Sequence, residues 1–229
     1  MSKLFLNWSG GKDCTMALFK LLEQKQSVDF LFTTLSKETN RVSMHGTSKE
    51  LITRQAMSLG IHSRKLYLPV EMNMEVYNKH LLHEMKLMQA REINTAVFGD
   101  VFLEDLKEYR EKQLASIGMK AVFPLWKRDT RELITEFIDR GFKAVIVCVN
   151  AKKLNKSFIG RTIDKDFVNE LPDDVDVCGE NGEYHSFVYD GPIFNKKINF
   201  ELSETVRKHY ASVDGGHDSE FYFLNIKHI

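Results

Sequence analysis

The sequence predicts an α/β protein with a doubly wound, mostly parallel sheet and a smaller C-terminal α+β domain. Strand-like and helix-like segments alternate regularly from residue 4 to about residue 149. Parallel strands need crossover connections, and helices usually supply them on both faces of the sheet. After residue 150 the alternation gives way to loops and short strands. These two observations predict the fold class and its division.

The first βαβ unit follows from residues 4–34. Apolar residues 4–8 predict a strand, and residues 28–34 predict a second one. Between them, apolar residues recur at helical spacing and predict an amphipathic helix. They are Cys14, Ala17, Leu18, Leu21 and Leu22.

Helix start and stop signals delimit the next units. Thr47 and Glu50 have capping-box spacing, and Gly60 predicts the end of that helix. Asp129 and Glu132 repeat the same spacing. By the same criteria we expect further helices at residues 74–92 and 103–117, and strands at residues 65–68, 96–98, 120–123 and 144–149.

The C-terminal part contains short predicted strands at residues 187–189 and 221–226. We expect an N-terminal domain of residues 1–128 and a C-terminal domain of residues 129–229. No Gly/Ser-rich or Pro-rich linker marks the boundary between them.

Composition limits the function classes. The chain has 229 residues, and its 32 Lys plus Arg equal its 32 Asp plus Glu. Without net positive charge, nucleic-acid binding is not favoured. No apolar run is long enough for a bilayer, and we expect a cytoplasmic protein without a signal peptide. The three isolated cysteines, without a CxxC pair, fit a reducing compartment.

The segment SGGKDC, residues 9–14, follows the first predicted strand. Gly10 and Gly11 permit a tight turn and a close approach to an anion, and the amides of the following helix and Lys12 supply positive charge. Asp13 beside a phosphate suggests a bound Mg²⁺. The segment matches neither GxxxxGK[ST] nor GxGxxG. A plain strand-to-helix turn is the alternative, but the whole string favours phosphate binding.

SGGKDC resembles the PP-loop, SGGxD[ST], of the ATP pyrophosphatases, and later segments are similar to the diphthine–ammonia ligase family. The segments that carry this resemblance are Met44-His45-Gly46, Gly99-Asp100, Pro124-Leu125-Trp126 and GENGEYHSFVYDGPIF at residues 179–194. The last is the most specific.

The resemblance implies an adenine nucleotide alpha-hydrolase-like fold with a nucleotide-binding N-terminal domain and a substrate-binding, catalytic C-terminal domain. It implies that ATP adenylates a carboxylate with release of pyrophosphate, and that ammonia then forms an amide. ATP and Mg²⁺ are the implied cofactors, with Asp13 as metal ligand. The expected nucleotide-binding residues are Ser9, Gly10, Gly11, Lys12, Asp13, Cys14, His45, Gly99, Trp126 and Asn181. The expected catalytic residues are Lys12, Asp100, Glu180, Glu183 and His185.

Two residues depart from the family pattern. Cys14 replaces Ser or Thr at the end of the loop, where a backbone amide matters most, so binding should persist. His185 replaces the last carboxylate of EGGEYE, as in a branch linked to corrinoid salvage. The carboxylate substrate is therefore diphthine or another acid, carried by a protein or free. We expect His185 to titrate near neutral pH and to accept a proton from ammonium, a role that Glu180 or Glu183 could also take.

Several alternatives stay open. GENGEYH can be a solvated polar loop, His45 a turn residue, and Trp126 a core or interdomain side chain rather than a ring stacked on adenine. Cys14 can be a nucleophile rather than a packed residue. Sulfur transfer to tRNA is a rival function, but it usually requires reactive cysteines and a basic surface. A noncatalytic nucleotide-binding module is another. A homodimer is possible.

Overall fold

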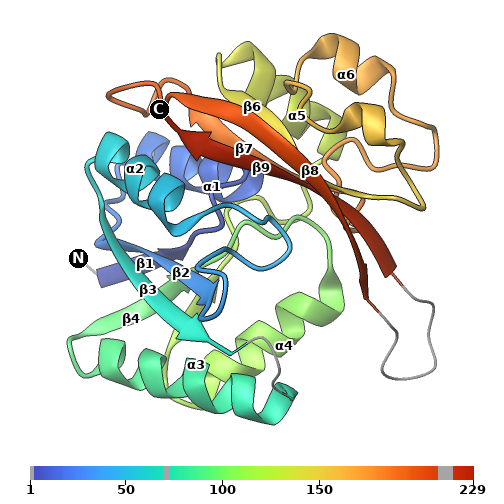
Figure 1. Ribbon diagram of the computed structural model, residues 1–229. Coiled ribbons are helices and arrows are strands. Elements are labelled where there is room, and N and C mark those ends of the chain that lie inside the picture. The colour runs from blue at the N-terminus through green and yellow to red at the C-terminus, as the bar shows by residue number, and fades with distance from the viewer. Residues whose placement is uncertain (1–2, 70–72, 211–218) are drawn as a thin grey trace.

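The computed structural model describes residues 3–69, 73–210 and 219–229, which form two sheets (Figure 1). The first sheet has five strands in the order β3-β2-β1-β4-β5, and all its pairings are parallel. Its strands are β1 (Lys3–Asn7), β2 (Phe30–Ser36), β3 (His62–Leu68), β4 (Ile93–Val97) and β5 (Lys120–Val122). The predicted α/β class with a parallel sheet is confirmed.

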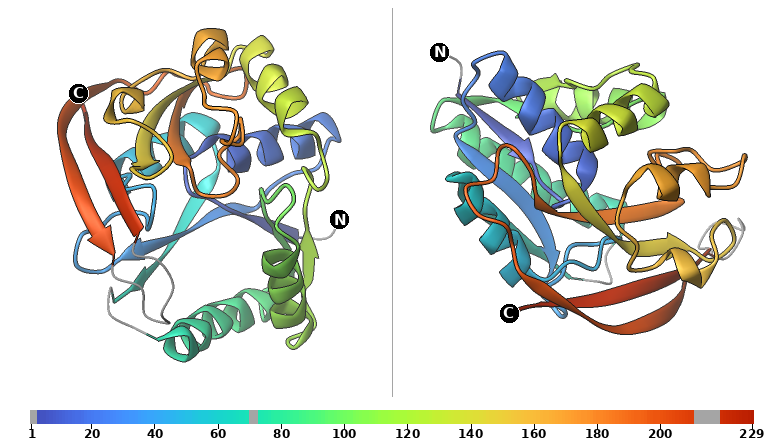
Figure 2. Two further views of the ribbon diagram at one scale, coloured as in Figure 1. Left: turned by 90° about the vertical axis from the view of Figure 1, so that its right-hand side faces the viewer. Right: turned by 90° about the horizontal axis from the view of Figure 1, so that it is seen from above.

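Helices cover both faces of the parallel sheet. They are α1 (Lys12–Glu23), α2 (Lys49–Leu59), α3 (Met74–Gln89) and α4 (Glu104–Ala115). Figure 2 shows α1 and α2 between the two sheets, with α3 and α4 on the outer face. Alternation along β1 explains both contacts: Phe5 packs with α3 and α4, whereas Leu4 and Leu6 pack with α1 and α2.

The second sheet is antiparallel and has the order β7-β6-β9-β8. Its strands are β6 (Lys143–Asn150), β7 (Tyr184–Asp190), β8 (Phe200–Tyr210) and β9 (Ser219–His228), and α5 (Thr130–Asp139), η1 (Lys156–Phe158) and α6 (Lys165–Asn169) belong to the same part of the chain. In the described residues, no helix is both long and apolar enough to cross a membrane.

The last strand of the alternating pattern joins the second sheet. Residues 144–149 suggested a further parallel strand, but β6 pairs antiparallel with β7 and β9. A strand buried on both faces has the same continuous apolar pattern in either sheet, so its sequence does not reveal its partners. β8 was not predicted, because most of its side chains are exposed and polar.

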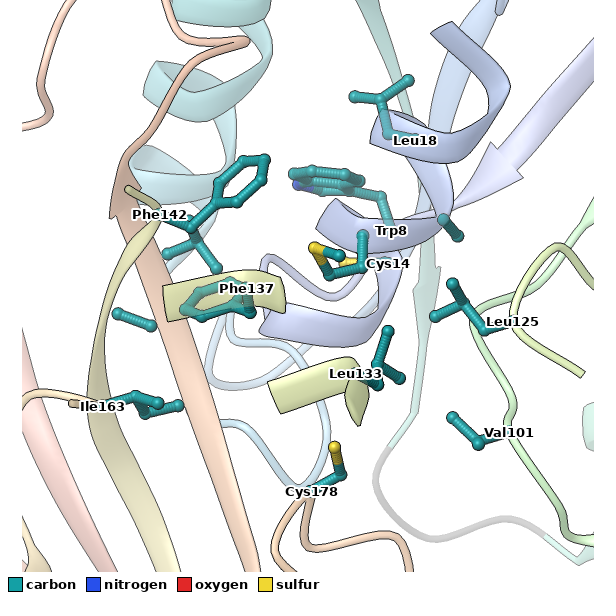
Figure 3. Close-up of a cluster of buried hydrophobic side chains, with 14 of the residues drawn as sticks. Trp8, Cys14, Leu18, Val101, Leu125, Leu133, Phe137, Phe142, Ile163 and Cys178 are labelled. Atoms are coloured by element: carbon teal, nitrogen blue, oxygen red, sulfur yellow. The ribbon is translucent and has the colours of Figure 1, made fainter. Parts of the chain in front are cut away.

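One continuous core lies between α1, α5 and the second sheet. Figure 3 shows Trp8, Cys14 and Leu18 facing Leu133 and Phe137 of α5. The predicted boundary at residue 128 falls between β5 and α5. Since α5 packs against α1, the core continues across this boundary. The boundary at residue 128 therefore stays a proposal.

The helix caps refine the sequence signals. Asp129 caps α5 by accepting a hydrogen bond from the Glu132 amide at 2.9 Å, as expected. For α2 the predicted cap, Thr47, is wrong by one residue: the Ser48 hydroxyl accepts from the Leu51 amide. Either hydroxyl suits the N-cap position, and the backbone path selects Ser48. Gly60 ends α2 in the left-handed conformation, as predicted.

The strand order creates a topological switch point between β1 and β4. The chain continues from β1 toward β2 and β3 on one side, and from β4 toward β5 on the other. Ligands of doubly wound sheets bind in the crevice outside the carboxyl ends of such strands. SGGKDC follows β1 and Gly99-Asp100 follows β4, so both segments meet at this edge.

Strand β7 is hydrogen-bonded directly to the loop after β1. The Val188 amide donates to the Gly10 carbonyl at 2.9 Å, and the Lys12 amide donates to the Ser186 hydroxyl at 3.1 Å. Gln55 of α2, which is fully buried, donates through its side-chain amide to the carbonyls of Gly10 and Val188 at 2.9 and 2.6 Å. Its carbonyl oxygen accepts from the Trp8 indole at 2.9 Å.

We expect Gln55→Leu to lower the free energy of unfolding by about 2–4 kcal/mol, because buried polar atoms of Trp8 and Val188 lose hydrogen-bond partners. It should also weaken ATP binding, since the loop loses a support. Urea unfolding and calorimetry measure the two effects. Gln24→Leu, at an exposed position, is the matched control. Equal stability of the two variants would contradict the role of Gln55.

Candidate active site

A cleft of about 550 Å³ lies at the switch point. Both domains line it: the loop after β1, residues 42–45, the start of the loop after β4, side chains of α3 and α4, and residues of the 179–186 segment. Most sequence-predicted residues meet here. Those lining the cleft are Ser9, Lys12, Asp13, Cys14, His45, Gly99, Asp100, Glu180 and His185.

The glycines allow close approaches around the cleft. Gly10 has a φ of 83°, and a Cβ there would lie 2.6 Å from the Gln55 side-chain oxygen. A Cβ on Gly11 would lie 2.8 Å from a ring carbon of His45, and one on Gly99 would lie 2.8 Å from the backbone of Asp13. Real side chains do not fit at such distances, so these positions require glycine. The three loops can therefore pack together at the start of α1.

Helix α1 begins at Lys12 without a side-chain cap. The amides of a first helical turn have no partner within the helix, and they attract anions. Here the Ser186 hydroxyl accepts a hydrogen bond from the Lys12 amide, and the Ser9 hydroxyl accepts one from the Gly11 amide at 3.4 Å. This geometry agrees with a phosphate-binding loop.

Lys12 is a buried cation with an adjacent anion. Its Nζ lies 2.8 and 2.9 Å from the two carboxylate oxygens of Asp13 and 5.3 Å from the centroid of the Tyr184 ring. Burial alone would lower the pKa of Lys12, but Asp13, together with Tyr184, Cys178 and Glu180, outweighs burial and holds that pKa well above its ordinary value. Lys12 is therefore charged at neutral pH, and an incoming anion would compete with Asp13 for it.

The two predicted carboxylates of the GENGEYH segment differ in their surroundings. Glu180 lines the cleft and accepts from the Val101 amide at 3.3 Å; burial, with a contribution from Asp13, raises its pKa to about 8. Glu183 is 2% exposed, outside the cleft lining. It accepts hydrogen bonds from the Asn181 amide, the Asn181 side chain and the Asp176 amide. Glu183 thus holds the loop that presents Glu180.

His45 and His185 form a ring pair at 4.6 Å between centroids. Burial lowers the pKa of His45 to about 4 and lowers the pKa of His185 well below its ordinary value. Our expectation that His185 titrates near neutral pH is wrong, because burial beside a second imidazole and Lys12 disfavours its cation. The pKa of Glu180, about 8, lies closer to neutral pH than the pKa of His45, about 4.

Four expected nucleotide-binding residues lie outside the cleft lining: Gly10, Gly11, Trp126 and Asn181. Trp126 packs against Phe123, at 5.9 Å between centroids, and lies 5.2 Å from Lys107 Nζ. Asn181 is exposed, with its side chain bonded to Glu183. Trp126 thus packs beside Phe123 and Lys107.

The cysteines are buried thiols. Cys14 donates to the Gly11 carbonyl, and burial raises its pKa, which favours the packed residue over the nucleophile. Burial also raises the pKa of Cys148 and Cys178 strongly. None of the three has the lowered pKa that sulfur transfer requires.

Sequence reasoning missed Gln55, Tyr77, Arg110 and Ser186. Ser186 follows GENGEYH directly, so the motif could have been extended to include it. Gln55, Tyr77 and Arg110 lie within ordinary helices without a motif. Only the placement of these helices around the sheet shows that Tyr77 and Arg110 line the cleft and that Gln55 bonds to the loop after β1.

Comparison with known proteins identifies the family. The profile described as Diphthamide synthase N-terminal domain matches residues 2–121, and the profile described as Diphthamide synthase C-terminal domain matches residues 129–222. The chain belongs to the diphthamide synthase family. The expected family is thereby confirmed, and with it the class of ATP-dependent ligases.

Curated relatives of this diphthamide synthase family member carry the name diphthine–ammonia ligase. The Danio rerio protein is 28% identical over 190 residues, which are 79% of this chain and 68% of that protein. The Rattus norvegicus protein is 26% identical over 226 residues, covering 86% of this chain and 82% of the relative. The Homo sapiens protein is 29% identical over 165 residues, covering 66% and 62%.

The raised pKa of Glu180 predicts a pH-dependent stability. A carboxyl group whose pKa is higher in the folded protein stabilises the fold fully below its ordinary pKa of 4.5, and this contribution is lost as pH rises through about 8. Between pH 5 and pH 9, Glu180→Gln should therefore gain about 4 kcal/mol relative to wild type in urea unfolding without ligands. Glu201→Gln, at an exposed position of β8, is the control. A constant difference at all pH values would contradict this assignment.

The lowered pKa values of His45 and His185 predict that neither ring titrates near neutral pH. In NMR titrations the ring signals of His45 should move with a midpoint near pH 4, and those of His185 should not change between pH 6 and 8. A lowered pKa stabilises the fold fully above the ordinary value of 6.5, and that stability is lost as pH falls through the folded value. Exposed His62 supplies a reference signal. A midpoint near pH 6.5 for either ring would overturn the assignment.

Proposed function

We propose that this protein adenylates a substrate carboxylate with ATP and transfers ammonia to it, in the manner of diphthine–ammonia ligases. A carboxylate oxygen attacks the α-phosphorus of ATP, and pyrophosphate leaves. The nitrogen of ammonia then attacks the acyl carbon, loses a proton, and displaces AMP to give an amide. The observation that carries the proposal is a single cleft lined both by residues of the glycine-rich loop after β1, residues 9–14, and by Glu180, whose pKa is about 8.

The loop residues have the phosphate-binding role in this proposal. The first-turn amides of α1 and the Lys12 ammonium would hold the phosphate charge as it moves toward the leaving pyrophosphate. Asp13 already neutralises Lys12, so ATP binding would separate them and leave Asp13 free for a cation. Ser9 and Gly11 keep the loop in its turn.

Mg²⁺ fits the chemistry of this cleft only together with the nucleotide. Among the described residues, no three His, Cys, Asp or Glu side chains gather closely enough to hold a metal ion alone. Mg²⁺ commonly binds one or two carboxylates plus substrate phosphates. Asp13 would be its protein ligand, and the ion would neutralise phosphate charge.

Glu180 would act as the general base. Ammonium must lose a proton before its nitrogen can attack, and a group with a pKa about 8 is suited to that transfer near neutral pH. Asp100 lines the same cleft and is paired there with Arg110. The neutral imidazoles of His45 and His185 would serve as hydrogen-bonding groups.

The substrate is a carboxylate, either diphthine, as the names of the relatives indicate, or a different acid. His185 at the end of GENGEYH, in place of a carboxylate, supports a different acid. We further propose a cytoplasmic location, because the cysteines are free thiols. A homodimer stays a prediction.

The products of the reaction test this proposal. With ammonium, Mg²⁺ and a panel of carboxylic acids, labelled ATP should yield AMP and pyrophosphate in equal amounts. Glu180→Gln should lower turnover at least 100-fold with nearly unchanged ATP affinity, because it removes the base but not the phosphate contacts. Lys12→Met should weaken ATP binding itself. ADP as the only nucleotide product would place the protein in another mechanistic class.

A further inference from the structure

Arg110 of α4 is a cation in the cleft to which the proposed chemistry gives no role. Its guanidinium carbon lies 4.2 Å from the centroid of the Phe98 ring. Its Nη2 donates to Asp100 Oδ1 at 3.2 Å, and its Nε lies 3.2 Å from Asp100 Oδ2. Both residues line the cleft, with 27% of the Arg110 side chain and 13% of the Asp100 side chain exposed.

The Arg110–Asp100 pair is incomplete. Among the described residues, neither Arg110 Nε nor Asp100 Oδ2 has an aligned hydrogen-bond partner, although both atoms are buried. Burial raises the pKa of Asp100 in spite of the adjacent guanidinium. A guanidinium binds a carboxylate best through two parallel hydrogen bonds, and buried polar atoms without partners are costly. A second carboxylate, aligned with the fork, would satisfy Arg110 better than Asp100 does.

The cleft wall that α3 and α4 form is mostly apolar. Tyr77, Leu81 and Met85 of α3 and Leu106 of α4 line the same cleft as Arg110. The phosphate-type loop supplies a separate cation, Lys12, which is paired with Asp13. The cleft thus offers a place for phosphate at Lys12 and a distinct place at Arg110 for an anion with an apolar body.

We infer that Arg110 binds the carboxylate of the acid substrate, which displaces Asp100 from the guanidinium, and that the apolar part of the substrate lies against Tyr77, Leu81 and Met85. This inference rests on the proposed function and specifies its substrate class. The substrate is an acid with apolar carbon next to its carboxylate. Asp100 occupies the guanidinium before the substrate arrives and competes with the substrate carboxylate for it.

The test uses 4-phenylbutyrate as the probe and 4-phenylbutanamide as its uncharged match, both titrated into the full chain by calorimetry. Wild type should bind the acid at least tenfold more tightly than the amide. Arg110→Gln should weaken acid binding about tenfold or more and leave amide binding unchanged, because only the acid can use the guanidinium. Lys112→Gln, which removes a charge from the exposed side of the same helix, should bind the acid like wild type.

Asp100→Asn gives the opposite readout. If Asp100 competes with the substrate for Arg110, removing its charge should tighten acid binding several-fold. A merely structural pair would give the reverse, since loss of Asp100 would loosen Arg110. Arg110→Lys, which keeps the charge without the fork, should recover only part of the acid affinity. Near-ultraviolet circular dichroism checks that each variant is folded.

Equal binding of acid and amide by wild type would overturn the inference, as would equal acid binding by Arg110→Gln and Lys112→Gln. Loss of ATP affinity in Arg110→Gln would make Arg110 a nucleotide residue and would also overturn it, while the proposed function would stand. Conversely, acid binding that depends on Arg110 in a protein that forms no AMP would refute the proposed function and keep the carboxylate site.

Discussion

The attachment of β7 to the loop after β1 is the constraint on which the site depends. Val188 and Ser186 bond to the backbone of Gly10 and Lys12, and buried Gln55 ties the same loop to β7 and to Trp8. These bonds set the end of the parallel sheet against the start of β7. Since Glu180 and His185 lie just before and at the start of β7, the joint also fixes their distance from the loop.

Charge compensation within the cleft follows from this enclosure. Placing charges in a poorly solvated space is costly unless each has a partner. Lys12 is paired with Asp13 and Arg110 with Asp100, whereas no ion pair joins Glu180 to the other described residues, and burial raises its pKa. Burial lowers the pKa values of the two histidines, so both rings stay neutral at neutral pH. The charges of these groups thus nearly cancel, and each of the two cations could exchange its carboxylate for an incoming anion.

This balance also bears on substrate choice within the diphthamide synthase family. An imidazole at position 185, packed on His45, adds no negative charge to the substrate side. Arg110 adds a positive charge beside an apolar wall. Both features favour binding of an anion in the cleft, which is consistent with a ligase that activates a carboxylate.

The sequence by itself determined the parallel half of the fold and the residues of the loop. Strand and helix periodicity, the Asp129 cap and Gly60 are local signals, and SGGKDC is a local motif whose backbone geometry needs only its own glycines and the helix that follows. These features were predicted because their physical causes lie within a few residues of each other.

The tertiary structure decided which side chains face the cleft and how they are charged. β6 pairs in the second sheet, Glu183 holds its own loop, Trp126 packs beside Phe123, and Arg110 lines the cleft from a helix without any motif. The lowered pKa of His185 and the raised pKa of Glu180 arise from burial by segments that are distant along the chain. Strand partners, burial and pKa values depend on contacts between distant segments, and only the folded chain brings those segments together.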